Sequence, residues 1–274
     1  MGRLRYMRNA RNGVRGSVIE GNILQQAVSN MDLDLYDSST TALYDVGTRL
    51  VTGDGRVFRY CKSGGECYTG QGAHFCNAIP ATGIDYSALA AAASVGDMSV
   101  VMTNQGTVTQ TLNGLKGGTI LLKPTSTSTN AVLQQRTIIG NTAGGVSDKI
   151  TISLDGPVSA ALTTSSYAFC MPSPYNNIKL DGTYASSVAG LPAVYISSSG
   201  YYFWIQTWGL CWIAPQSDLG TADSARQCVF RHDGSIGAHD YSVALQGTQQ
   251  HAGFVVDNNA AANGSTVIML QISP

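Results

Sequence analysis

Residues 43–62, LYDVGTRLVTGDGRVFRYCK, carry the clearest local structural signal in the sequence. Two segments, LYDVGTRLV (43–51) and RVFRYCK (56–62), flank turn residues 52–55, and the Asp54-Gly55 pair is a strong signal for a hairpin turn. Val57 alternates with Arg56 and Phe58, as a half-exposed strand requires. This stretch therefore predicts a β-hairpin.

Further strand candidates follow at short intervals and are separated by clusters of Gly, Asn, Ser or Pro. They are 98–103, 118–123, 135–140, 149–154, 192–197, 201–208, 210–214, 228–232, 253–257 and 265–272. No long helical patterns alternate with them, which argues against a parallel α/β sheet. We therefore expect an all-β fold of sandwich or barrel domains, with an extended N-terminal arm and little helix.

Two short segments are helix candidates. Residues 17–30 begin with Ser17 and Glu20 in a capping-box pattern, and residues 84–94 predict a short helix or an Ala-rich turn. We expect the chain to divide into an N-terminal arm with a possible short helix (1–42), a hairpin-rich segment (43–96) and a main β-sandwich or barrel domain (97–274).

The composition agrees with a β-rich chain that works in contact with partners. The chain has 31 glycines, only 12% charged residues, and just two glutamates, Glu20 and Glu66. Glu and Lys normally fill exposed helix faces, so their scarcity disfavours a helical protein. The 16 basic and 17 acidic residues nearly cancel. Such a weakly charged surface gives a free monomer poor solubility and suits a chain that partners cover.

Positive charge is concentrated at the N-terminus. Residues 1–16 contain Arg3, Arg5, Arg8, Arg11 and Arg15 and no acidic residue. The segment is either a disordered tail or an arm that binds a neighbour or an acidic surface, and we predict a capsid-binding arm. The rest of the chain is net acidic and predicts no nucleic-acid groove. We also expect no membrane span and no secretory signal, and therefore six reduced cysteines.

The common catalytic signatures are absent from the sequence. It contains no G-x-S-x-G elbow, no H-E-x-x-H motif and no Walker loop. Five aspartates, Asp54, Asp97, Asp155, Asp181 and Asp233, adjoin a glycine, as turn residues do. Cys61, Cys67, His74 and Cys76 could supply four zinc ligands, but the spacing C-x5-C-x6-H-x-C does not match common structural zinc sites. We expect no enzymatic activity, no catalytic residues, no cofactor and no bound metal.

An aromatic run, Tyr201-Tyr202-Phe203-Trp204, begins one of the predicted strands. In a strand, Tyr202 and Trp204 point to one face and Tyr201 and Phe203 to the other. Core packing, a subunit interface and a sugar-binding platform are the three alternatives. We predict that one face is core, and that Tyr201, Phe203 and Trp208 contribute to an oligomer interface.

Several stretches resemble segments of structural proteins of tailed phages, especially those of uncultured marine and freshwater phages. They are YDVGTRLVTGDGRVFRYCKSGG (44–65), ITISLDGPVSAALTTSSYAFCMPSPYNNI (150–178), GYYFWIQTWGLCWI (200–213), FRHDGSIGA (230–238) and GFVVDNNAAANGSTVIMLQISP (253–274). The resemblance spans residues 44–274 with gaps. It implies a β-rich fold, assembly into oligomers, attachment to the capsid lattice and no catalytic residues.

These observations together predict a head decoration (cement) protein on the capsid surface of the virion, assembled in the host cytoplasm. Its expected partners are the major capsid protein and further copies of itself, in a homo-trimer or another homo-oligomer. The alternatives are a tail or fibre protein of the virion, or a carbohydrate-binding virion protein.

Overall fold

A computed structural model describes residues 5–8, 15–19, 23–25, 35–76, 83–124, 133–181, 186–215, 219, 226–239, 250–259 and 265–274. Within these ranges all regular structure is β-strand and no helix occurs, which confirms the predicted all-β class. The strands are β1 (Arg5–Arg8), β2 (Arg15–Ile19), β3 (Ile23–Gln25), β4 (Arg49–Val51), β5 (Val57–Ser63), β6 (Ala73–Phe75), β7 (Ile84–Ala88), β8 (Ser99–Thr103), β9 (Thr119–Lys123), β10 (Gln134–Asn141), β11 (Lys149–Leu154), β12 (Tyr167–Met171), β13 (Asn176–Lys179), β14 (Val188–Pro192), β15 (Tyr202–Trp212), β16 (Gln227–Phe230), β17 (Ile236–Ala238), β18 (His251–Asn259) and β19 (Ser265–Gln271).

The chain forms two compact units, one inserted into the other. The first unit contains Met1–Cys76 and Tyr175–Pro274, and the second contains Asn77–Pro174. These limits differ from the expected segments 1–42, 43–96 and 97–274, because the chain leaves the first unit after Cys76 and returns to it at Tyr175.

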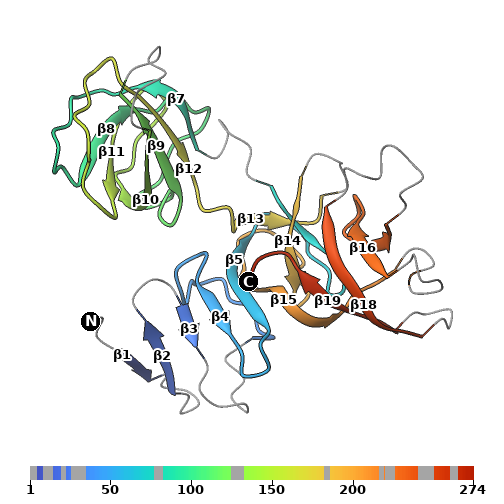
Figure 1. Cartoon of the computed structure of the whole chain (residues 1–274). Helices are drawn as coiled ribbons and strands as arrows, with labels where there is room; N and C mark the ends of the chain where they lie inside the picture. Colours follow the sequence, from blue (N-terminus) through green and yellow to red (C-terminus); the bar gives the residue numbers. More distant parts are fainter. Residues whose placement is uncertain are drawn as a thin grey trace. The chain divides into compact units, whose positions relative to one another are not determined.

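The inserted unit is a closed barrel (Figure 1). Its sheet has the order β7-β12-β9-β10-β11-β8. The two outer strands meet through a bridge between Leu89 and Met102, where the amide of Ala90 donates to the carbonyl of Val101 at 2.8 Å. Alternate residues of β9 and β11 are buried, as the period of a strand requires. Closing the sheet removes free strand edges and encloses an aliphatic core.

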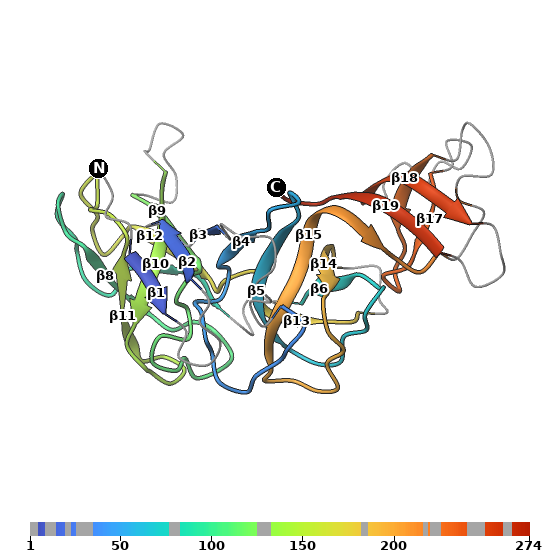
Figure 2. The same cartoon turned by 90° about the horizontal axis from the view of Figure 1, so that it is seen from below.

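The first unit is organised around the long strand β15 (Figure 2). Its sheet has the order β1-β2-β3-β4-β5-β13-β6-β14-β15-β19-β18-β16-β17, and β15 also pairs with β5. Its buried apolar residues form three separate clusters, and β15 borders all three. The predicted hairpin at 43–62 is confirmed as β4 and β5, with Gly55 at a φ of 83° in the turn.

Both predicted helical segments contain strands instead. Residues 15–19 and 23–25 are β2 and β3, and the other residues of the segment 17–30 lie outside the described ranges. β-Branched Val18, Ile19 and Ile23 favour extended backbone, which explains the error. Residues 84–88 form β7, and isolated bridges follow at Leu89 and Ala93.

Most of the predicted strands are confirmed, with a few exceptions. Strand β14 ends at Pro192, where the predicted strand 192–197 began, and 201–208 and 210–214 are a single strand. Strands β6, β12, β13 and β17 were not expected. Three of these have only three or four residues, which is too short to show a periodic pattern.

Candidate interaction surface

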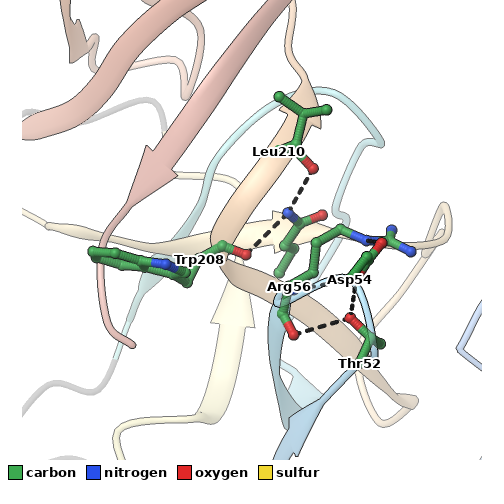
Figure 3. A network of polar contacts seen from close by, with 6 residues as sticks. Thr52, Asp54, Arg56, Trp208 and Leu210 are labelled. Atoms are coloured by element: carbon green, nitrogen blue, oxygen red, sulfur yellow. Dashed lines mark hydrogen bonds and ion pairs between the residues drawn. The ribbon is translucent and has the colours of Figure 1, made fainter.

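Strand β15 bends at Gly209, directly after Trp208, the residue that pairs with both β5 and β19. Gly209 has a φ of 98°, and a Cβ there would lie 3.0 Å from the Cα of Arg56, so only glycine fits without displacement. The side chain of Gln206 donates from Nε2 to the carbonyls of Trp208 at 3.1 Å and Leu210 at 3.0 Å. These contacts hold the backbone on both sides of the bend, between the part of β15 that pairs with β5 and the part that pairs with β19 (Figure 3).

The hairpin turn before β5 holds Arg56 in place beside this bend. Asp54 accepts a hydrogen bond from Arg56 Nε at 2.7 Å, and Thr52 donates to the carbonyl of Arg56 at 3.1 Å (Figure 3). The ring of Phe58 lies 5.4 Å below the guanidinium carbon of Arg56. The bend therefore packs against a side chain with fixed partners.

Beyond the bend, strands β15, β19 and β18 present an apolar face to solvent. Leu210 pairs with Met269, and Met269 pairs with Phe254, so these three side chains form a row on one side of the sheet. Trp212 pairs with Val267 in the next row, and Val256 follows at a bulge in β18. Leu210, Trp212, Phe254 and Val256 are 52%, 50%, 44% and 53% exposed. We call Leu210, Trp212, Phe254, Val256, Val267 and Met269 the outer face.

The opposite side of the same three strands is core. Ile213, Ile268 and Leu270 are fully buried there and pack with Cys211 and Val255. The strands are therefore apolar on both sides, and the first unit covers only one of them. A contiguous exposed apolar face of this kind marks an interaction surface.

Polar residues surround the outer face. His251 Nε2 lies 3.3 Å from the side-chain oxygen of Gln271, beside Trp208 in the register of β15 and β19. Gln227 lies opposite Phe254, and Asp257 lies opposite Val267. An apolar centre with a polar rim is the usual anatomy of a protein–protein interface.

The structure separates the three aromatic residues that were predicted to contribute to an interface. Phe203 is fully buried in a cluster with Cys61 and Ile205, so its side chain is core, and this part of the prediction is wrong. Tyr201 is half-buried at the edge of that cluster. Trp208 is half-buried at the bend, one row from Leu210.

Trp204, on the opposite side of β15 from Phe203, is also buried within the chain. Its ring lies 5.0 Å from that of Tyr60 and 5.4 Å from that of Tyr44, and Leu50 and Phe58 complete the cluster. The start of β15 is therefore covered on both sides without a partner. The exposed apolar residues of the outer face begin at Leu210, nine positions after Tyr201, where the predicted interface began.

The structure describes three of the five arm arginines at the level of the backbone. Arg5 and Arg8 are the first and last residues of β1, and Arg15 begins β2, whereas Arg3 and Arg11 lie outside the described residues. Strands β1, β2 and β3 form an antiparallel ladder, and β3 pairs parallel to β4. The described part of the arm thus extends the sheet of the first unit, and its role in capsid attachment stays a prediction.

Of the four residues with possible zinc-binding chemistry, Cys61 and Cys67 pack in one buried cluster, and each thiol donates to a backbone carbonyl, Cys61 to that of Phe203 at 3.3 Å and Cys67 to that of Ile178 at 3.6 Å. His74 is buried and accepts at Nδ1 from the amide of Asp181 at 3.3 Å, and burial lowers its pKa. Burial also raises the pKa of Cys67 to about 12, so its thiol stays protonated at neutral pH. No group of three His, Cys, Asp or Glu residues suited to a metal ion occurs within the described ranges. All six cysteines are free thiols.

The barrel unit presents a second set of exposed apolar residues. Val108 and Leu112 are exposed on the loop 104–118, Val146 on the loop 142–148, and Ile139 on strand β10. The fully buried Asn104 fixes these loops, because its Nδ2 donates to the carbonyls of Val108 and Gly145 at 3.0 Å each and its Oδ1 accepts from Gly106 at 3.0 Å.

Comparisons with known proteins identify no relative: no protein family, no curated protein and no solved structure matches this chain. In the described part of the chain, no helix is long and apolar enough to cross a membrane.

Proposed function

We propose that this chain is a structural protein of a tailed-phage virion, and specifically a head decoration (cement) protein. It binds the major capsid lattice as a homo-oligomer and stabilises the lattice. The observation that carries the proposal is the outer face, a contiguous apolar surface on a sheet whose other side is already core.

The outer face can supply the energy that self-association needs. Burying a Leu or Phe side chain contributes about 1.5–3 kcal/mol relative to full exposure. The four most exposed side chains of the outer face are each about half exposed. They therefore offer roughly 3–6 kcal/mol per subunit before the cost of association. Such a contact is weak alone and becomes strong when a ring or lattice repeats it.

The second support is the sequence resemblance to virion structural proteins, which spans residues 44–274 with gaps. The surface chemistry is consistent with this class. Only 12% of residues are charged, and the arm places five arginines within residues 1–16 without an acidic residue. An arm with this charge favours an acidic surface such as that of a partner lattice.

A carbohydrate-binding virion protein is the second candidate, and one cluster favours it. The rings of Tyr68 and Tyr195 are exposed, with centroids 5.6 Å apart, and Tyr195 donates to Glu66 at 2.7 Å. Hydrogen bonds from Tyr195 and Tyr68 lower the pKa of Glu66. Two aromatic faces beside a carboxylate provide the stacking surface and the acceptor that sugar recognition uses.

Immunogold labelling of particles from a phage that encodes this chain tests the proposal. Antibodies against the chain should label the head surface, at many positions on each particle. Labelling of the tail would support a tail or fibre protein instead. Particles without label would contradict any virion role. Binding of the purified chain to host glycans, abolished in Tyr195→Ala, would favour the carbohydrate alternative.

A further inference from the structure

Two arginines lie directly opposite each other on β4 and β5. Arg49 pairs with Arg59 in the register of the hairpin, so both side chains start from the same face of the sheet. Directly opposed like charges destabilise a strand pair unless a counter-charge lies nearby. The hairpin therefore contains an electrostatic conflict at this position.

The Nε–H groups of both arginines are buried and lack a hydrogen-bond acceptor. The guanidinium of Arg59 is otherwise held in place, since Nη1 donates to the carbonyl of Gly47 at 3.4 Å and its carbon lies 5.8 Å from the ring centroid of Tyr175. A buried donor without an acceptor is rare in proteins and calls for a specific explanation, such as a bound ion.

A third arginine of the same hairpin shows the contrast. Arg56 forms an ion pair with Asp54, with Nε 2.7 Å from the carboxylate oxygen. Among the described residues, no acidic side chain forms an ion pair with Arg49 or Arg59. The hairpin thus supplies a carboxylate to one arginine and leaves two neighbouring ones without an anion.

We propose that Arg49 and Arg59 form a binding site for an oxyanion. The planar guanidinium group presents N–H donors in a fork that matches the oxygen atoms of phosphate or carboxylate. An oxyanion bound between the two side chains would neutralise the opposed charges and accept from donors such as the unpaired Nε–H groups. The ligand is free phosphate or a carboxylate of a neighbouring copy of the chain. This inference is independent of the proposed function.

Isothermal titration calorimetry with inorganic phosphate at pH 7.5, at constant ionic strength set with sodium chloride, tests the site. We expect one phosphate per chain, with affinity lowered about tenfold or more in Arg49→Gln and in Arg59→Gln. Arg136→Gln is the matched control: this arginine of the inserted unit donates to the carbonyl of Pro157 at 2.8 Å, and its substitution should leave the affinity unchanged.

Two further measurements make the result decisive. In buffer without phosphate, Arg49→Gln should melt no lower than the unsubstituted chain, because it removes a like-charge pair. Sedimentation velocity with and without phosphate separates the sources: an unchanged mass indicates a free anion, and a reduced mass indicates displacement of a neighbour's carboxylate. The proposal is overturned if phosphate neither binds nor changes the mass, or if binding persists in both glutamine variants.

Discussion

Replacing Trp204 by alanine tests the assignment of β15 as the centre of the first unit. Trp204 is 1% exposed and contacts the rings of Tyr44 and Tyr60. Truncating a buried Trp costs about 3–5 kcal/mol through lost burial and the cavity left behind. For a domain of this size, that loss lowers the melting temperature by roughly 6–20 °C.

Trp212 provides a matched control on the same strand. It is 50% exposed and packs over Gly70, where a Cβ would lie 2.1 Å from the indole ring. At concentrations at which the chain is monomeric, Trp212→Ala should therefore cost about 1 kcal/mol, as is usual for partly exposed positions.

Tryptophan fluorescence is a suitable assay because it reports on the first unit alone. All three tryptophans of the chain, Trp204, Trp208 and Trp212, lie in β15. Each variant keeps two of them, so its urea unfolding curve follows this unit without a signal from the barrel. Equal losses of unfolding free energy in Trp204→Ala and Trp212→Ala would refute the burial argument.

Three further predictions follow from single positions. In thermal unfolding, Gly253→Ala should lower the melting temperature by several degrees more than Gly96→Ala. Both glycines have a positive φ, but only at Gly253 would an added Cβ clash with a backbone atom, the carbonyl oxygen of Met269 at 1.9 Å. Equal losses in the two variants would contradict this. Asn104→Ala should destabilise the barrel by about 2–4 kcal/mol, because the three hydrogen bonds that Asn104 makes to its loops are lost. Amide hydrogen exchange in the barrel should become faster, and an unchanged exchange rate would contradict this. Burial raises the pKa of Cys67 to about 12, whereas in the unfolded chain a cysteine has a pKa of roughly 8.5. The resulting contribution to the free energy of unfolding is fully present below roughly pH 8.5 and is lost as the pH rises toward 12. Urea unfolding should show stability falling above about pH 9, less steeply in Cys67→Ser, and an equal slope in both proteins would exclude this cause.

The fold class and many of the strands could be predicted from the sequence because their signals are local. The Asp54-Gly55 turn and the alternation in 149–154 depend on residues that are adjacent in the chain. The insertion of one unit into the other could not be predicted in this way. It depends on β5 pairing with β13 and β15, more than a hundred residues later in the sequence.

The candidate site was only partly foreseen, for a similar reason. Three residues of the aromatic run, 202–204, were correctly placed on a strand and Tyr201 precedes it, but the burial of the run depends on Tyr44, Tyr60 and the second cluster around Cys61. The outer face becomes apparent only when the register aligns Leu210 with Met269 and Phe254. Each of these strands has apolar residues at consecutive positions, so its sequence alone does not tell which side the fold covers, and the contiguous face is identified only in the assembled sheet.

Sedimentation velocity of the purified chain tests the central claim, assembly through the outer face, most directly. We predict that the chain sediments as a homo-oligomer at micromolar concentration and that Phe254→Asp sediments as a folded monomer, because a charge at the centre of an apolar interface is strongly unfavourable. Val95→Asp should keep the oligomer, since Val95 is 64% exposed on the inserted barrel and lies outside the outer face. A chain that remains monomeric at high concentration, or a Phe254→Asp variant that keeps the full oligomer mass, would contradict the account.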